Sequence, residues 1–218
     1  MQTTSTLRYD AVIFDLLTAL IDSWKLWNDV AGSEEAGMKW RKRYLDITYG
    51  CGTYRPYETL VREAAAEAGM PVHAADELER RWTELEPWPD VPEVLAAIDG
   101  HLPMAVATNC SERMGRIAAA CAGGNFSVIA TAEGVGYYKP RPEVYKAVLE
   151  QLGTDPARTL FVAGSASDVP GAKGVGMPVY WHNHVGLPPR DDARPDFFER
   201  TLAPLPGIIL GDDRSRTG

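Results

Sequence analysis

The sequence predicts an α/β fold in which a parallel β-sheet core carries an inserted, all-helical cap. Short runs rich in Val, Ile and Ala, each bounded by Gly, Pro, Asn or Asp, are typical of buried parallel strands. These runs alternate with segments whose apolar residues recur at helical spacing, as in parallel sheets with right-handed crossovers. One long stretch after the first run contains helical patterns and no strand pattern, which indicates an insertion.

The first predicted strand is the run YDAVIFDL at residues 9–16, which is apolar apart from its two aspartates. Apolar periodicity and a terminal Gly predict the core helices. The other predicted strands cover residues 104–109, 126–131 (the weakest pattern), 159–164 and 178–183, and the predicted core helices cover residues 92–100, 112–124 and 141–153.

The predicted insertion follows the first strand. Residues 22–85 read as a succession of helices, and the sequence PWPD at residues 87–90 marks the return to the core. We therefore expect an α/β core formed by residues 1–21 and 86–218, and a helical cap formed by residues 22–85.

Composition excludes several classes of protein. The 218 residues carry a formal net charge of −8, whereas nucleic acids and anionic membranes are bound through surplus Lys and Arg. Cys51, Cys110 and Cys121 are scattered and odd in number, which argues against a disulfide framework and a zinc site. His182 and His184 lack a third ligand in the sequence, so we expect no metal there. With no apolar leader and no run of membrane-spanning length, we expect a cytoplasmic protein.

Polar residues follow successive predicted strands at the point where each strand ends. One such residue often only caps the next helix, but a succession of them is harder to explain structurally. Because ligands of open α/β sheets bind beyond the carboxyl ends of the strands, we expect these side chains to form one site. They are Asp15 after the first strand, Thr108 and Asn109 after the second, Lys139 before the helix that follows the third, and Ser165 and Asp168 after the fourth.

The order of these residues resembles the haloacid dehalogenase superfamily, and most of all its 2-haloacid dehalogenase branch, which includes the related L-azetidine-2-carboxylate hydrolases. The resemblance covers most of the chain and implies a Rossmann-like core with a helical cap. It is carried by the segments VIFDLLTALID, KWRKRYLD, VATNC, YKPRPEVY and FVAGSASDVPGAKGVG, and by RPDFFERTLAPLPGII near the C-terminus.

The resemblance implies that Asp15 is a nucleophile and that Arg41 binds the substrate. It also implies functional roles for Lys139, Tyr145 and Asp168. Lys139 would favour the ionised form of Asp15 against burial, and Asp168 would orient Lys139 or the hydrolytic water. Thr108 and Asn109 offer donors to a substrate carboxylate or an oxyanion, and Arg41 can bind a carboxylate in bidentate fashion.

Two departures from the superfamily's phosphatases bear on the chemistry. Their acid two residues after the nucleophile is Leu17 here, which cannot transfer a proton. Their metal-binding acid is Gly164 here, which leaves Mg²⁺ too few hard oxygen ligands. We therefore expect neither metal nor cofactor. Without a proton donor, the leaving group must be a halide or an already protonated amine in a strained ring, displaced through an ester of Asp15.

The substrate pocket also departs from the 2-haloacid dehalogenase branch. A hydroxyl is absent at Ala19 but present at Thr18, and the last motif has Ser165 in place of Asn. We expect Leu17, Thr18, Trp24, Tyr145 and Ser165 to join Arg41 in binding the substrate. Trp24, with Trp27, could hold a cation, which favours L-azetidine-2-carboxylate over an L-2-haloacid.

Two alternatives remain open from the sequence. One is a phosphatase with an unusual metal site, and the other is an inactive binding protein that keeps the fold. As partners we expect a small carboxylic acid substrate, neither nucleic acid nor membrane, with a homodimer as a candidate assembly.

Overall fold

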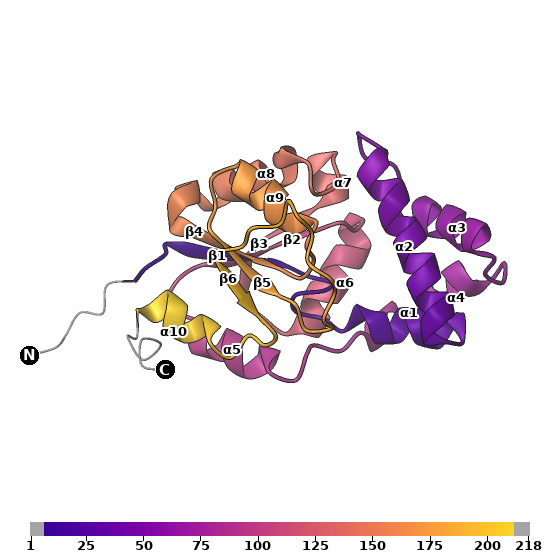
Figure 1. Cartoon of the computed structure of the whole chain (residues 1–218), viewed down its shortest axis with the longest axis horizontal. Helices are drawn as coiled ribbons and strands as arrows, with labels where there is room; N and C mark the ends of the chain where they lie inside the picture. Colours follow the sequence, from indigo (N-terminus) through magenta and orange to yellow (C-terminus); the bar gives the residue numbers. More distant parts are fainter. Residues whose placement is uncertain (1–6, 212–218) are drawn as a thin grey trace, which may run out of the picture.

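A six-stranded, fully parallel sheet forms the centre of the computed structural model, which describes residues 7–211 (Figure 1). Its strand order is β3-β2-β1-β4-β5-β6, so β1 lies inside the sheet between β2 and β4. This arrangement confirms the predicted α/β fold. The strands are β1 (Ala11–Asp15), β2 (Met104–Thr108), β3 (Phe126–Thr131), β4 (Thr159–Ala163), β5 (Val179–His182) and β6 (Phe197–Glu199).

All five predicted strands form, and β3 has the predicted bounds. The others are shorter because polar or turn-forming residues such as Asn109, Gly164 and Asn183 lie just beyond their ends. Strand β6 was not predicted. It has three residues, pairs only with β5 and is largely exposed, so its sequence carries little of the apolar pattern of a buried strand.

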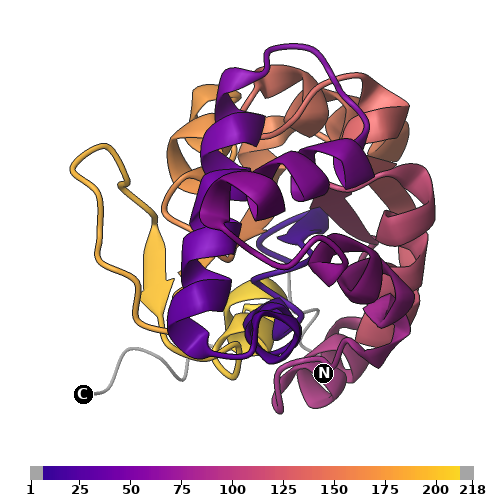
Figure 2. The ribbon, with the colours of Figure 1, turned by 90° about the vertical axis from the view of Figure 1, so that its right-hand side faces the viewer.

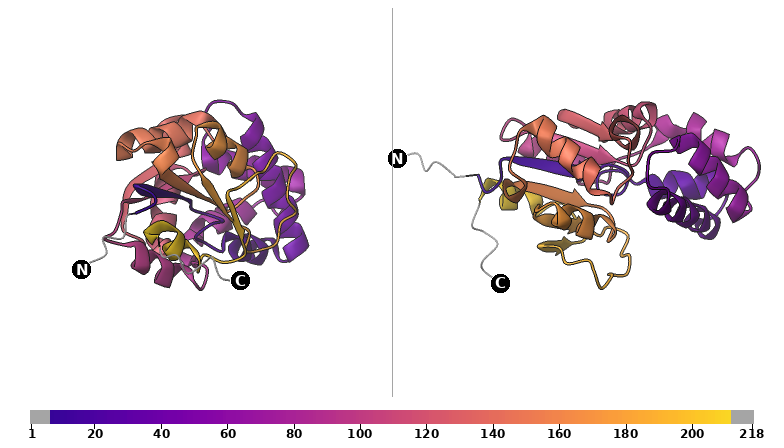
Figure 3. Two further views of the ribbon diagram at one scale, coloured as in Figure 1. Left: turned by 60° about the vertical axis from the view of Figure 1, so that its left-hand side comes forward. Right: turned by 90° about the horizontal axis from the view of Figure 1, so that it is seen from above.

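Alternate residues of the strands face opposite layers of helices. Phe14 of β1 packs in the core layer that contains α5, α6 and α10, whereas Ile13 packs in the layer that contains α8 and α9. Figure 1 shows α8 and α9 above the sheet and α5 and α10 below it, and the left view of Figure 3 shows the same two layers. The core helices are α5 (Val91–Ile98), α6 (Glu112–Ala122), α7 (Ala132–Val135), α8 (Pro142–Leu152), α9 (Asp168–Gly174) and α10 (Leu205–Leu210), with a 3₁₀ turn at Pro156–Arg158.

A second group of helices lies at one end of the sheet, within the segment that we predict as the cap, and we keep that name for residues 22–85. In Figure 2, which faces the cap, its helices lie in front of the carboxyl end of β1. Ser33 caps α2 by accepting a hydrogen bond from the amide of Ala36, and Gly32 makes the turn before it with a φ of 82°. The cap contains α1 (Ser23–Ala31), α2 (Glu34–Gly50), α3 (Tyr57–Ala68), α4 (Ala74–Arg80) and a 3₁₀ turn at Trp82–Glu84.

The chain passes between core and cap twice, and the two passages lie side by side. Ile21 and Pro87 form an antiparallel bridge, and the amide of Trp88 donates to the carbonyl of Leu20 at 3.0 Å. Further bonds attach the cap to the core at a distance from these passages. The hydroxyl of Tyr138 donates to the carbonyl of Arg55 at 2.8 Å, for example.

The helix α2 has 17 residues. No helix within residues 7–211 combines the length and the apolar character needed to cross a membrane.

Trp82 is one of the buried links between the cap and the core, because its indole N–H donates to the carbonyl of Met114 at 3.0 Å. We expect Trp82→Phe to lower the free energy of unfolding by about 2 kcal/mol, since it leaves that carbonyl unpaired and removes buried volume. Urea unfolding measures this change. Val72→Ala, at a fully exposed position, is the control and should change stability by less than about 0.5 kcal/mol. Equal stability of the two variants would contradict this role of Trp82.

Candidate active site

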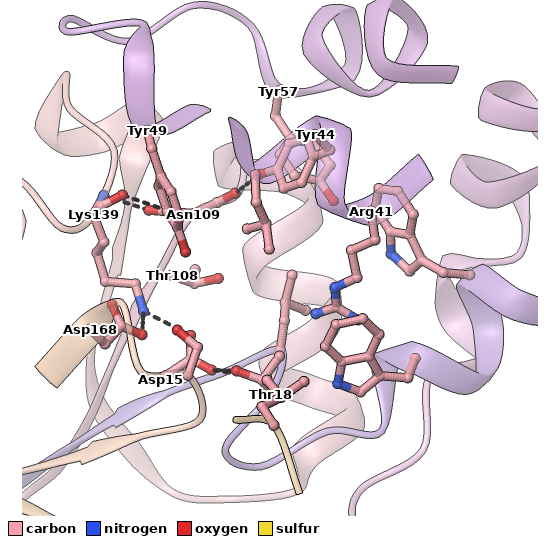
Figure 4. A pocket seen from close by; sticks show the side chains of 16 residues that line it. Asp15, Thr18, Arg41, Tyr44, Tyr49, Tyr57, Thr108, Asn109, Lys139 and Asp168 are labelled. Atoms are coloured by element: carbon pink, nitrogen blue, oxygen red, sulfur yellow. Dashed lines mark hydrogen bonds and ion pairs between the residues drawn. The ribbon is translucent and has the colours of Figure 1, made fainter. Parts of the chain in front are cut away.

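The two carboxylate oxygens of Asp15 have different partners. Asp15 ends the central strand β1, and its side chain is buried. Oδ2 accepts three hydrogen bonds, from the amide of Thr18 (2.9 Å), the hydroxyl of Thr18 (2.6 Å) and the amide of Ala19 (3.0 Å). Oδ1 accepts one, from Nζ of Lys139 at 2.7 Å (Figure 4). The hydroxyl of Thr18 thus reaches the carboxylate that Ala19 can contact only through its backbone.

Lys139 lies between two acids. Its Nζ is 2.7 Å from Asp15 and 3.0 Å from Oδ2 of Asp168, and all three side chains are buried. Asn109 holds the backbone of Lys139 in place: its Oδ1 accepts from the Lys139 amide at 2.6 Å, and its Nδ2 donates to the Lys139 carbonyl at 3.1 Å. These bonds connect Asn109 to Lys139, and its expected donation to the substrate stays a prediction.

Asp168 is held by a second partner. The buried hydroxyl of Tyr145 donates to its Oδ1 at 2.8 Å. We expected Tyr145 to contact the substrate, but it does not line the cavity described below. Its helix α8 packs behind α9, so the ring reaches Asp168 from inside the core. Tyr145 therefore orients Asp168 and has no direct access to a ligand.

The charges of this cluster depend on one another. Burial raises the pKa of Asp15, but the charge of Lys139 and the hydrogen bonds from Lys139 and Thr18 lower it by more, so the pKa lies below its ordinary value of 3.8. Burial raises the pKa of Asp168 above that value despite the opposing charge of Lys139. Burial lowers the pKa of Lys139, but the two carboxylates outweigh it and raise the pKa above its usual range. At neutral pH Asp15 is therefore ionised and Lys139 is protonated.

A cavity of about 80 Å³ lies between this cluster and the cap. One water molecule needs about 10–15 Å³, so the cavity accommodates a ligand of only a few non-hydrogen atoms. Figure 4 shows Arg41, Tyr44 and Tyr57 of the cap on one side and Asp15 with Lys139 on the other, with Tyr49 of the cap on the side of Lys139. The predicted residues that line it are Asp15, Leu17, Thr18, Trp24, Arg41, Thr108, Asn109, Lys139, Ser165 and Asp168.

The cavity is also lined by residues that were not predicted as site residues. Three of them follow Arg41 on α2 at spacings of three, four and eight: Tyr44, Leu45 and Tyr49. These spacings put them on the same face of the helix as Arg41, so the sequence could have identified them. Tyr57 and Leu187 carry no comparable signal. Trp27, which the sequence placed beside Trp24, lines the cavity as well.

Three buried polar groups on cap residues that line the cavity have no hydrogen-bond partner. They are Nη1 of Arg41, Nε1 of Trp27 and the hydroxyl of Tyr57, and all three residues line the cavity. No carboxylate within residues 7–211 forms an ion pair with Arg41, and burial lowers its pKa. Its guanidinium lies over the ring of Trp24, 3.9 Å from the centroid, and 5.8 Å from that of Trp27. The cation that Trp24 holds in this structure is thus Arg41.

The position of Gly164 has no room for a side chain. A Cβ atom there would lie 2.2 Å from the hydroxyl oxygen of Thr18 and 2.3 Å from the amide nitrogen of Ala19. An acid at this position would therefore displace the loop that binds Oδ2 of Asp15. Across residues 7–211, no three His, Cys, Asp or Glu side chains are grouped in a way that could hold a metal ion.

Thr108 is fully buried at the end of β2, where its hydroxyl donates to Sγ of Cys110 at 3.3 Å. Sulfur is a weak acceptor, so this bond leaves Thr108 free to turn toward a ligand. Ser165 lies on the opposite wall, after β4.

Replacing Lys139 with Met leaves the buried carboxylates of Asp15 and Asp168 without their cation. We expect the free energy of unfolding at pH 7 to fall by roughly 3–5 kcal/mol. In this variant burial and mutual repulsion raise both folded-state pKa values above those of the unfolded chain. Protonation then stabilises the folded variant, so the deficit should shrink between pH 7 and pH 5.

Urea unfolding at both pH values tests this expectation. The exposed pair Lys173–Asp196 provides the control, because Lys173→Met should change stability by less than about 1 kcal/mol at either pH. A deficit in Lys139→Met that does not vary with pH would contradict the electrostatic origin.

Comparisons with known proteins agree with this geometry. Residues 9–176 match the family model described as haloacid dehalogenase-like hydrolase. The chain is 29% identical over 211 residues to an (S)-2-haloacid dehalogenase of Xanthobacter autotrophicus, with 89% of this chain and 82% of that protein covered. It is 28% identical over 174 residues to a phosphoglycolate phosphatase of Aquifex aeolicus (strain VF5), with 76% and 80% covered.

Among solved structures, the chain resembles the L-2-haloacid dehalogenase of Xanthobacter autotrophicus with chloropropionic acid covalently bound. The TM-score is 0.81 at 25% identity, over 94% of this chain and 99% of that one. The family model covers most of the chain, and the dehalogenase likenesses extend over nearly all of it. The chain therefore belongs to the haloacid dehalogenase-like hydrolases.

Proposed function

We propose that this chain is a metal-independent hydrolase in which Asp15 attacks the sp³ carbon of a small 2-substituted carboxylic acid. One observation carries the proposal: Oδ1 of Asp15 faces the cavity with Lys139 as its one partner, while Oδ2 is bound by three donors. Leu17 lines the cavity at the position where the superfamily's phosphatases have their proton-donating acid, and a leucine cannot protonate a leaving group. A carboxylate nucleophile without a neighbouring acid suits a leaving group that needs no proton from the protein as it departs.

In the first step Oδ1 forms a bond to C2 of the substrate from the side opposite the leaving group. The bond from C2 to that group breaks and its electron pair goes with the group, so a halogen leaves as the halide ion and a protonated ring amine as the neutral amine. Lys139 keeps Asp15 ionised for this attack, because its charge lowers the pKa of the carboxyl group. The apolar walls exclude water from the nucleophile.

In the second step a water molecule attacks Cγ of the ester. The bond from Cγ to Oδ1 breaks, and Oδ1 departs as the 2-hydroxyl oxygen of the product. The negative charge of the tetrahedral intermediate collects on Oδ2, where the amides of Thr18 and Ala19 and the Thr18 hydroxyl donate. One proton of the water passes to the hydroxyl product and the other to solvent. Asp168, whose pKa is raised by burial, is suited to accept the second proton before it reaches solvent.

The three unpaired groups of the cap favour an anionic ligand. Arg41, Trp27 and Tyr57 each present a buried donor to the cavity, and a buried donor without a partner is unfavourable until a ligand accepts from it. A 2-haloacid supplies a carboxylate and, on reaction, a halide. These donors and the relatives named (S)-2-haloacid dehalogenases support an L-2-haloacid as the first choice.

L-azetidine-2-carboxylate is the second candidate. Its expected basis was a substrate cation on Trp24, but Arg41 already lies over that ring. This contact moves the preference to the haloacid, although both leaving groups suit the same mechanism.

A phosphatase is supported by one relative, the phosphoglycolate phosphatase, and opposed by Leu17 and by the crowding at Gly164. The buried charges of Asp15, Lys139 and Asp168 argue against an inactive binding protein. Their burial costs desolvation free energy, which an inactive site gives no reason to retain.

The first experiment incubates the protein with L-2-chloropropionate and L-azetidine-2-carboxylate in the presence of EDTA and follows both by proton NMR. We expect chloropropionate to be consumed and Asp15→Asn to be at least about 10³-fold slower. Displacement at C2 followed by cleavage at Cγ inverts C2 once, so the product should be D-lactate. Consumption of the azetidine alone would reverse our choice of leaving group. Full activity of Asp15→Asn, or turnover only with added Mg²⁺, would refute the mechanism.

Single turnover in H₂¹⁸O tests which atom the water attacks. With enzyme in excess, we expect lactate without the label and one ¹⁸O atom on the peptide that contains Asp15, because the product oxygen comes from Oδ1. Mass spectrometry of the product and of the digested enzyme measures both. Label in the first-turnover product would instead mean that water attacks the substrate carbon directly.

A further inference from the structure

Side chains from three segments outside the loop that follows β1 form hydrogen bonds to its carbonyls. Three of its consecutive carbonyls each accept a side-chain hydrogen bond. The carbonyl of Leu17 accepts from the hydroxyl of Ser23. The carbonyl of Thr18 accepts from the indole N–H of Trp88 at 3.1 Å, and that of Ala19 pairs with Nδ1 of His182 at 2.8 Å.

Two of these bonds act on the peptide groups that contact Asp15. The carbonyl of Leu17 and the amide of Thr18 belong to one planar peptide group, and the carbonyl of Thr18 and the amide of Ala19 belong to the next. In a trans peptide the C=O and N–H bonds point in opposite directions. The donor behind each carbonyl therefore lies in line with the N–H that reaches Oδ2 of Asp15.

We propose that Ser23 and Trp88 are positioning residues that aim and polarise the two amides holding Oδ2 during hydrolysis of the ester. A hydrogen bond to the carbonyl of a peptide strengthens the bond that its N–H donates, because chains of hydrogen bonds polarise one another. The inference rests on the proposed function, since the ester of Asp15 is the species whose hydrolysis the amides assist. Neither residue touches the substrate: Ser23 and Trp88 do not line the cavity.

Both braces are buried and fixed in orientation. Ser23 is fully buried at the start of α1, and Trp88 is 6% exposed. The ring of Trp88 stacks on His184 at 4.0 Å, and its amide donates to the carbonyl of Leu20 at 3.0 Å. Donors held in this way keep their direction when charge develops on Oδ2, as preorganised stabilisation requires.

The position of the braces connects the cap to the chemistry. Ser23 lies just after the passage from core to cap, and Trp88 lies just after the return. A shift of the cap that moved either passage would therefore move a donor behind the oxyanion site. His182 lies outside this arrangement, because the next amide, that of Leu20, bonds to the carbonyl of Leu16 at 3.3 Å and not to Asp15.

The second step of the reaction should be sensitive to the braces and the first step should not. In the free enzyme the charge of Asp15 is shared by both oxygens, whereas the tetrahedral intermediate concentrates it on Oδ2. Removal of one direct oxyanion donor slows reactions by about 10²–10³-fold. Loss of a brace leaves that donor in place, so we expect a smaller effect, on the order of tenfold.

The test is a rapid-quench single turnover of the full-length protein, with the ester of Asp15 counted by intact-protein mass spectrometry. The substrate is whichever of L-2-chloropropionate and L-azetidine-2-carboxylate the wild type consumes. We expect Ser23→Ala and Trp88→Phe to slow decay of the ester about tenfold with formation within about twofold, so that the ester accumulates. Ser23→Thr, which keeps the hydroxyl, should restore rapid decay.

Tyr180→Phe is the matched control. The hydroxyl of Tyr180 also donates to a backbone carbonyl, that of Thr201 at 2.5 Å, which is not part of the loop after β1. It should leave both steps unchanged. Two results would overturn only the positioning role of Ser23 and Trp88. One is decay of the ester at the wild-type rate in both Ser23→Ala and Trp88→Phe. The other is equal slowing of ester formation and ester decay in all variants. Absence of any ester in a wild type that turns over its substrate would overturn the proposed mechanism and the braces together.

Discussion

The structure is organised around the buried ammonium of Lys139. Its Nζ bonds to Asp15 at the end of β1 and to Asp168 at the start of α9, and these three residues come from segments far apart in the sequence. Two buried carboxylates would repel each other and take up protons without this cation. Neighbouring residues serve the same interaction: Asn109 fixes the backbone of Lys139, and Tyr145 fixes Asp168. The charge state of Asp15 thus depends on the packing of β1, β2, β4 and α8 against one another.

The site divides its tasks between the two parts of the chain. The core supplies the charged cluster and the amides around Oδ2 of Asp15, all held by backbone that the sheet positions. The cap supplies aromatic rings and the unpaired groups of Arg41, Trp27 and Tyr57. Under the proposed function, the core carries out the bond changes and the cap selects which small acid reaches them.

Much of this arrangement could be predicted from the sequence. Buried parallel strands have a simple pattern, an apolar run that ends in polar residues. This pattern located five strands and, at or after their ends, Asp15, Lys139 and Asp168. Strand β6 was missed because three partly exposed residues have too little pattern to show. The orientation of side chains was harder to predict. Tyr145 faces Asp168 instead of the cavity, and Trp24 holds Arg41 instead of a ligand, since both contacts depend on how separate helices pack.

The space at Gly164 has an evolutionary consequence. The hydroxyl of Thr18 occupies the volume that a side chain at position 164 would need. An acid introduced at position 164 would also meet the backbone between Thr18 and Ala19, so it would displace the amides around Asp15. A useful acid at position 17 would also have to replace Leu17. Under the proposed function, a change to metal-dependent phosphate chemistry would therefore need new residues at both positions together with a rearranged loop. The crowding around the loop after β1 thereby separates the proposed chemistry from that of the superfamily's phosphatases.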